Sequence, residues 1–200
     1  MELILVRHGK TEYNEQQKYC GALDPSLSEK GRAELETAEV RRFLEENPPE
    51  LVFSSPMKRA LETADLLCLD FPALPLLVVP ELRECDFGDF EGRAFEGDLE
   101  HDPAYQAWVD GHCEDPIPGG DFPDRFREDA VVGFESVIET CQTEGIERAM
   151  VVTHGGVIGG VLEAVATPHR DWYEYRVPNG GYVVLELPDH IKTMGGGATC

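Results

Sequence analysis

Three short apolar runs along the chain each end in polar or basic residues and lead into a stretch with helical spacing. LILV (3–6) precedes RHGKTEYN, LVF (51–53) precedes SSPMKRALETADLL, and AMVV (149–152) precedes THGGVIGGVLEAVA. Continuous aliphatic runs of this length are typical of strands that are buried on both faces of a sheet. The pattern therefore predicts three strands, each followed by a helix. In the second unit, Ser54 and Ser55 are candidate helix caps and Pro56 fits the first turn.

Two further helices are predicted between these units. The first runs from about Ser28 to Glu46 and is ended by Pro48 and Pro49. The second runs from about Pro123 to Thr143, with apolar residues at helical spacing. These are Phe126, Ala130, Val131, Phe134, Val137, Ile138 and Cys141.

The order of the elements predicts the fold class. YVVLEL (182–187) is the last predicted strand, and strands alternate with helices along the whole chain. This alternation is typical of an α/β fold, here a three-layer α/β/α sandwich with a mostly parallel central sheet. The chain has 200 residues, of which 42% are hydrophobic, enough for one domain spanning residues 1–200. Within it, the Pro- and Gly-rich segment of about 93–123 is expected to form a cap-like insertion.

Basic side chains follow the predicted strands at the points where the strands end. Arg7 and His8 follow the first, Arg59 lies one turn into the helix after the second, and His154 with Gly155 follows the third. In open α/β sheets, ligands bind outside the carboxyl ends of the strands, where helix N-termini also present free amides. Guanidinium groups match phosphate oxygens bidentately. The sequence therefore predicts a phosphate site in which Arg7 binds the anion and His8 attacks it.

The overall charge makes this cluster more informative. The chain carries 17 basic and 39 acidic residues, a formal net charge of −22. Nucleic acids and anionic membranes favour clustered Lys and Arg, so neither is an expected partner. A small phosphorylated substrate is the expected partner, held at short range against the field of the whole protein.

The six cysteines indicate neither a zinc site nor a disulfide framework. They lack C-x-x-C spacing and do not alternate with histidines, and Leu3–Val6 is far too short for a secretory leader. We expect no metal, reduced thiols and a cytoplasmic location. No stretch approaches the roughly 20 apolar residues of a membrane span. The terminal GGGATC is expected to be frayed.

Three motifs together resemble the histidine phosphatase superfamily, also called the phosphoglycerate-mutase-like family. They are RHGKTEYN, SSPMKRALETA and VVTHGG, and they occur in order over nearly the whole chain. The resemblance implies that His8 becomes phosphorylated and that Arg7, Arg59 and His154 form the phosphate pocket, with Asn14 as a polar contact. It implies no metal and no cofactor.

A fourth segment, ELRECDFGDFEGR (81–93), is similar to the one that carries the proton donor in the phosphatase branch. Glu84 matches that position, and Asp86 is the alternative. The segments YCGALDPSLSEKGRAE and PGGD are most similar to alpha-ribazole phosphatases and their broad-specificity relatives. The resemblance thus implies metal-independent hydrolysis of a phosphomonoester through a phosphohistidine, with alpha-ribazole 5'-phosphate as one candidate substrate.

Some positions depart from the family pattern or stay open. Cys20 replaces a polar residue that contacts the phosphoryl group in relatives, and Asp121 stands where many relatives have Glu and receives no catalytic role. Lys10 is either a source of positive field at the pocket or a solvated lysine. Tyr105 and Trp108 either cover the pocket or pack the cap onto the core.

Two other functions remain as alternatives, a cofactor-dependent mutase and a catalytically inactive phosphate-ester-binding or regulatory protein. The mutases use additional basic residues in the inserted segment, whereas residues 94–124 contain no Lys or Arg. The intact set of His8, Arg7, Arg59, Glu84 and His154 argues against an inactive protein. A homodimer is one expected form of assembly.

Overall fold

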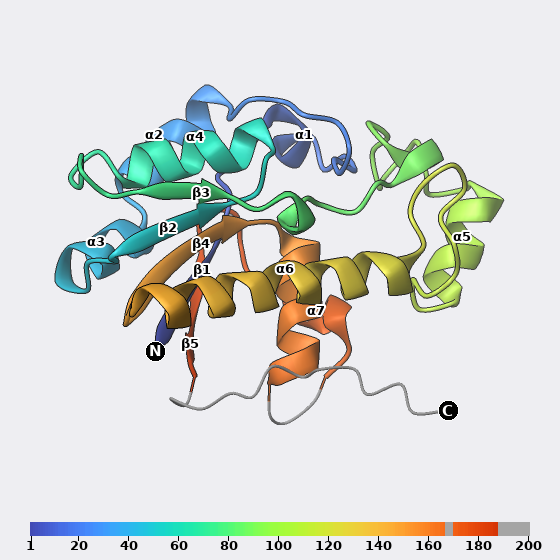
Figure 1. The fold of residues 1–200 in the computed structure, drawn as a ribbon. Helices are drawn as coiled ribbons and strands as arrows, with labels where there is room; N and C mark the ends of the chain where they lie inside the picture. Colours follow the sequence, from blue (N-terminus) through green and yellow to red (C-terminus); the bar gives the residue numbers. More distant parts are fainter. Residues whose placement is uncertain (167–169, 188–200) are drawn as a thin grey trace, which may run out of the picture.

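The computed structural model describes residues 1–166 and 170–187, which contain one five-stranded sheet (Figure 1). The strand order is β3-β2-β4-β1-β5, with bounds β1 (Glu2–Arg7), β2 (Leu51–Ser54), β3 (Leu76–Val78), β4 (Arg148–Thr153) and β5 (Tyr182–Glu186). All neighbouring strands are parallel except β1 and β5, which are antiparallel. The predicted mostly parallel sheet is confirmed. The edge strand β3 was not predicted, and the GGGATC tail lies outside the described residues.

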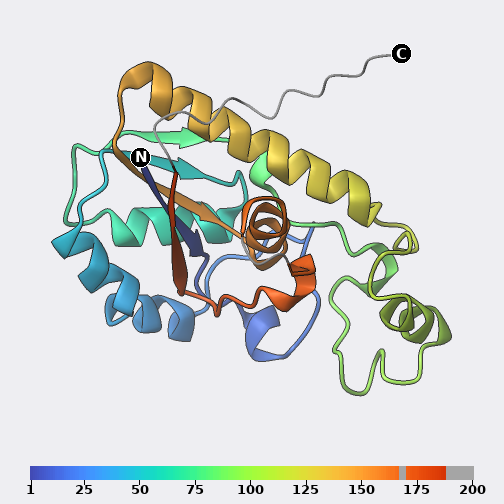
Figure 2. The ribbon, with the colours of Figure 1, turned by 90° about the horizontal axis from the view of Figure 1, so that it is seen from below.

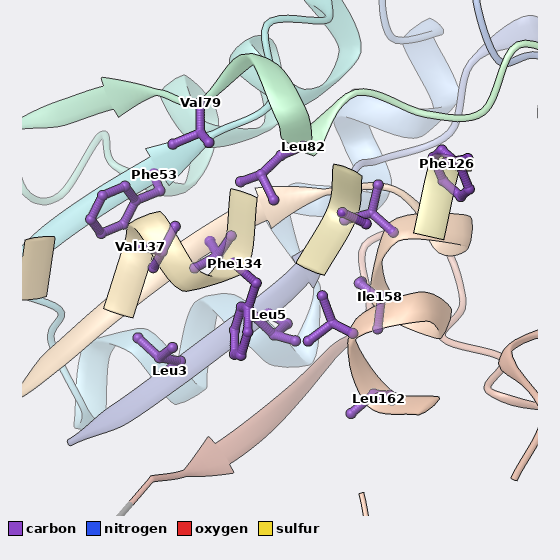
Figure 3. Packing of buried hydrophobic residues seen from close by; sticks show 14 of the residues in the cluster. Leu3, Leu5, Phe53, Val79, Leu82, Phe126, Phe134, Val137, Ile158 and Leu162 are labelled. Atoms are coloured by element: carbon purple, nitrogen blue, oxygen red, sulfur yellow. The ribbon is translucent and has the colours of Figure 1, made fainter. Parts of the chain in front are cut away.

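Helices cover both faces of the sheet, as predicted. One face carries α6 (Pro123–Glu144) and α7 (Gly155–Val165), and the other carries α2 (Glu29–Glu36), α3 (Glu39–Glu46) and α4 (Lys58–Leu67) (Figures 1 and 2). The alternation of side chains along β1 explains how one strand serves both layers. Leu3 and Leu5 belong to the apolar cluster under α6 and α7 (Figure 3), whereas Ile4 and Val6 pack with residues of α3 and α4.

Helix α6 lies close to its predicted bounds and buries one side. Phe126, Phe134 and Val137 point from it into the apolar cluster shown in Figure 3. Gly145 ends the helix in the left-handed conformation, with φ of 69°, which glycine adopts without steric cost. In the described parts of the chain, no helix combines the length and apolar character needed to cross a membrane.

The helix predicted from Ser28 to Glu46 is in fact two helices. The chain breaks between α2 and α3, where Ala38 has an extended backbone conformation. The two parts bury different surfaces: Leu35 of α2 lies over Gly9, whereas Val40 and Leu44 of α3 pack onto the sheet. A single straight helix would not bring both apolar sets to their separate targets.

The segment 93–123 lies to one side of the sheet and contains the helix α5 (Pro103–Asp110) (Figures 1 and 2). Trp108 is buried in the main apolar cluster, together with Leu99 and Ile117. Aromatic side chains from outside the segment also join this packing, with the Tyr19 and Trp108 ring centroids 6.1 Å apart. The segment is therefore attached to the core through a largely aromatic contact.

Candidate active site

The carboxyl ends of β1 and β4 bring two histidines together. The strands are parallel, with Arg7 paired to Thr153, so the residues that follow them, His8 and His154, are neighbours. Their ring centroids lie 5.1 Å apart with an angle of 61° between the planes. Both rings are buried, and Arg59 of α4 is also buried at this edge. The predicted convergence of Arg7, His8, Arg59 and His154 is thus observed.

The surroundings of His8 fix its protonation. Its Nδ1 lies 2.7 Å from the carbonyl oxygen of Gly9. A carbonyl can only accept, so Nδ1 carries the proton and Nε2 is left with its lone pair. Burial, followed by the charges of Arg59 and Arg7, holds the pKa of His8 well below its ordinary value. The imidazole is therefore neutral and suited to act as a nucleophile through Nε2.

Arg59 is held by backbone carbonyls rather than by a carboxylate. Its Nη1 donates to Leu23 O at 2.8 Å and its Nη2 to Gly21 O at 2.9 Å. Gly21 is required in this loop, since a Cβ there would lie 1.7 Å from the carbonyl oxygen of Cys85. These bonds fix the orientation of the guanidinium without a salt bridge that would neutralise it.

Glu91 anchors the loop that positions Arg59. Its carboxylate accepts from the backbone N–H of Gly21 at 2.9 Å, of Ala22 at 2.8 Å and of Phe87 at 3.0 Å. The motif that carries Glu84 therefore also ties the loop 20–23 to the segment 84–91. Nothing in the sequence distinguished Glu91 from the other acidic residues, because its role depends on a contact between distant segments.

His154 is oriented by Ser55. The Ser55 Oγ lies 2.7 Å from His154 Nε2 and accepts from the backbone N–H of Met57 at 3.3 Å. The prediction of Ser54 and Ser55 as helix caps with Pro56 in the first turn is wrong, because α4 begins at Lys58 with Met57 as its N-cap residue. The conformation of this turn directs the Ser55 hydroxyl toward the imidazole instead.

Buried donors without partners surround the two histidines. In the described residues, the donors Arg7 Nε and Arg59 Nε are buried and have no hydrogen-bond partner, and neither has the buried His154 Nδ1. Arg7 is otherwise fixed by a 2.8 Å bond from Nη1 to Val177 O, and Gly155 passes so close that a Cβ there would lie 3.2 Å from Arg7 Cζ. Protein interiors rarely leave such donors unpaired. A site rich in donors and positive charge is suited to an oxyanion.

Glu84 is the carboxylate of the site. Its Oε1 accepts from Cys85 N and its Oε2 from Gly156 N, both at 3.1 Å. Burial raises the pKa of Glu84, an effect that these two bonds and the charges of Arg59 and Arg7 offset only in part. Glu84 lines the same cavity as His8, whereas Asp86 does not and instead accepts from Gly88 N at 2.8 Å. Geometry therefore favours Glu84 over Asp86 as the proton donor.

Asn14 is oriented by the short helix α1 (Glu12–Glu15). Its Oδ1 accepts from Thr11 N at 3.0 Å and its backbone N–H donates to Thr11 Oγ1 at 3.3 Å, which forms a capping box, and Oδ1 also accepts from the Thr11 hydroxyl at 3.1 Å. With Oδ1 occupied, Asn14 can offer only its Nδ2 hydrogens to a ligand. Asn14 lines the cavity, as its predicted contact with phosphate requires.

The cavity has a volume of about 490 Å³ and an aromatic wall, for which the sequence offered only Tyr105 and Trp108 as candidates. Trp108 lines it, whereas Tyr105 packs against Tyr19 with the two hydroxyl oxygens 3.3 Å apart. Two basic side chains, Lys18 and Arg176, also line it. The remaining aromatic residues of the wall are Tyr19, Phe87, Phe95, Trp172 and Tyr175.

The structure shows where the residues that depart from the family pattern or were left open lie. Cys20 lines the cavity, and burial raises the pKa of its thiol to about 11. Lys10 is not among the cavity residues and pairs with Glu34 at 2.9 Å. Asp121 binds Arg83 at 2.8 Å and accepts from the backbone of Asp86, a structural role. Across the residues that the structure describes, no group of three or more His, Cys, Asp or Glu side chains is arranged to hold a metal.

Comparisons with known proteins identify the family. Residues 3–194 match the model of the histidine phosphatase superfamily, branch 1, and the chain belongs to this superfamily. It is 31% identical to the adenosylcobalamin/alpha-ribazole phosphatase of Salmonella typhimurium, over 97% of this chain and 94% of that protein. It is also 31% identical to a metal-independent phosphoserine phosphatase of Arabidopsis thaliana, over 80% of this chain and 66% of that protein.

A solved structure gives the same assignment. The alpha-ribazole phosphatase from Shigella flexneri superposes with a TM-score of 0.78 at 26% identity, covering 94% of this chain and 91% of that one. The predicted phosphoglycerate-mutase-like fold and the prediction of a phosphatase are both confirmed.

Proposed function

We propose that the protein hydrolyses phosphomonoesters without a metal ion, through a phosphohistidine at His8. The observation that carries this proposal is the unprotonated Nε2 of a buried, neutral His8 at a cavity that Arg7 also lines, with the charge of the neighbouring Arg59 helping to lower the pKa of His8. A neutral imidazole beside two guanidinium groups has little to bind except an anion with an electrophilic centre.

In the first step, His8 Nε2 attacks phosphorus as the bond to the ester oxygen breaks. Glu84, whose pKa burial raises, donates its proton to that oxygen so that the alcohol leaves neutral. Arg7, Arg59 and His154, with the amide of Asn14, stabilise the charge on the equatorial oxygens. The proton on His8 Nδ1 stays bonded to the carbonyl of Gly9.

In the second step, water replaces the alcohol and attacks the phosphohistidine. Glu84, now ionised, takes a proton from this water, and inorganic phosphate leaves with His8 restored. The peptide N–H of Gly156 and that of Cys85 stabilise the carboxylate between the two steps.

Alpha-ribazole 5'-phosphate is our first candidate for the substrate. The support is the name of the relatives that cover nearly the whole chain, together with the aromatic wall, which suits a bulky leaving group. We also propose a cytoplasmic location, in keeping with the five free cysteines of the described residues.

The proposal is tested by the hydrolysis of 4-nitrophenyl phosphate in excess chelator, comparing the native protein with His8→Ala. We expect turnover that resists the chelator and falls by at least about 10⁴-fold in the variant, since removal of a nucleophile has effects of this order or larger. Far-UV circular dichroism checks the fold of the variant. Turnover that needs a metal, or that survives in His8→Ala, would refute the mechanism.

A further inference from the structure

Basic side chains without an ion-pair partner are concentrated at the cavity. Ten of the 16 described Lys and Arg residues lie within 4.0 Å of a carboxylate oxygen, as the excess of acidic residues leads one to expect. Among the described residues, six have no such partner. Two of them, Arg7 and Arg59, serve the phosphate. The other four are Lys18, Lys58, Arg170 and Arg176.

Lys18 and Arg176 are the members of that group of four that line the cavity. The backbone of each is tied to the site. Lys18 N donates to Tyr13 O at 2.8 Å, and Lys18 forms a bridge with Ala94 where the segment 93–123 begins. Arg176 precedes Val177, whose carbonyl accepts from Arg7 at 2.8 Å. Both residues are thus positioned at the cavity that holds His8.

The charge of one phosphate monoester does not account for four cations. A phosphate group carries at most two negative charges and is already served by Arg7 and Arg59. The net charge of −22 repels anionic ligands, and the repulsion grows with the negative charge of the ligand. Additional cations at the cavity are therefore needed most for a ligand that carries a second anionic group.

We propose that Lys18 and Arg176 form a second anion subsite, which binds a carboxylate or a second phosphate on the leaving part of the substrate. The inference rests on the proposed phosphatase function and predicts that esters with two anionic ends are better substrates than singly anionic ones such as alpha-ribazole 5'-phosphate. The aromatic wall, including Tyr19 next to Lys18 and Tyr175 next to Arg176, contacts the body that joins these ends.

The test compares three aryl esters that share one body. Phenyl phosphate has one anionic group, 4-carboxyphenyl phosphate adds a carboxylate, and 1,4-phenylene bisphosphate adds a phosphate. We expect the native protein to prefer at least one doubly anionic ester over phenyl phosphate by about fivefold or more in kcat/KM. The doubly anionic ester with the higher kcat/KM shows whether the subsite prefers a carboxylate or a phosphate.

The double variant K18Q/R176Q should abolish this preference, so that kcat/KM for the preferred doubly anionic ester falls to about the value for phenyl phosphate. The matched control is K58Q/R170Q, which removes two unpaired, exposed cations that do not line the cavity and so changes the net charge equally. It should retain the preference, because charges screened by solvent act weakly at a distance.

Any of three results would contradict the proposed subsite. The first is that the native protein shows no preference for a doubly anionic ester. The second is that K18Q/R176Q lowers kcat/KM equally for all three esters, as general electrostatic steering would, and the third is that the control variant removes the preference as fully as the test variant. If none of the esters is hydrolysed, the phosphatase function itself fails. These results are therefore distinguishable.

Discussion

The floor and the mouth of the cavity are built on different principles. At the floor, His8 and Glu84 are buried, as is the neighbouring Arg59, and each of the three is fixed by backbone groups. At the mouth, Lys18 is half-buried and Arg176 is exposed, and neither has an ion-pair partner among the described residues. The contrast teaches that the reaction depends on preorganised groups that need not move, whereas substrate choice depends on side chains that remain accessible.

The largest effect at the floor, short of removing His8, is expected for Glu84→Gln. An amide cannot donate a carboxylic proton, so esters with poor leaving groups lose about 10²–10⁴-fold in turnover. Phenyl phosphate should therefore suffer far more than 4-nitrophenyl phosphate, whose leaving group needs little protonation. Asp86→Asn is the control and should affect both esters equally and slightly. Equal losses on both esters in Glu84→Gln would reject Glu84 as the acid.

The pH dependence sharpens the assignment of acid and nucleophile. The lowered pKa of His8 makes the reactive neutral form available from mildly acidic pH upward, so kcat/KM rises through that pKa. The raised pKa of Glu84 keeps its proton available above the usual range of carboxylic acids, and kcat/KM falls as pH rises through that pKa. We expect an optimum on the acidic side of neutrality for phenyl phosphate. The falling limb should disappear in Glu84→Gln, and its persistence would assign it to another group.

A smaller loss is expected for Ser55→Ala. The substitution leaves His154 Nε2 without its 2.7 Å partner and frees the imidazole to rotate. We predict a decrease of about tenfold in kcat/KM, equivalent to ~1.4 kcal/mol. Ser55→Thr, which keeps the hydroxyl, should restore most of the activity if the pocket admits the methyl group. Unchanged kcat/KM in Ser55→Ala would show that His154 needs no such support.

The smallest effect is expected for Lys10→Ala, although Lys10 is part of the first motif. Its ammonium pairs with Glu34, and both side chains are partly exposed, so the pair contributes little. Activity toward every ester should stay within about twofold of the native protein, measured by steady-state kinetics. A tenfold loss of activity would mean that the charge of Lys10 acts on the floor of the cavity, although its side chain lies at the surface.

The floor could be predicted from the sequence because its residues are placed by regular structure. His8 and His154 directly follow parallel strands, and such strands deliver their next residues to the same edge. The family resemblance added Glu84 and Asn14, which lie in loops and which pattern alone does not place.

The mouth could not be predicted in the same way. Lys18, Phe87 and Arg176 come from three segments far apart in the chain, and only tertiary packing brings them to one cavity. The same reason applies to Glu91, whose contact with Gly21 spans 70 residues. The break between α2 and α3 could not be predicted, because both segments have helical periodicity. Periodicity does not show that the two helices pack against different surfaces.

The most direct measurement is the capture of the covalent intermediate. The protein is mixed with a phenyl phosphate labelled with ³²P, quenched in alkali, where phosphohistidine survives, and mapped by peptide mass spectrometry. The proposed mechanism predicts ³²P label on the peptide that contains His8. The amount of label should differ between the native protein and Glu84→Gln, and no label should be found in His8→Ala. Turnover without any labelled peptide, or with label on a residue other than His8, would contradict it.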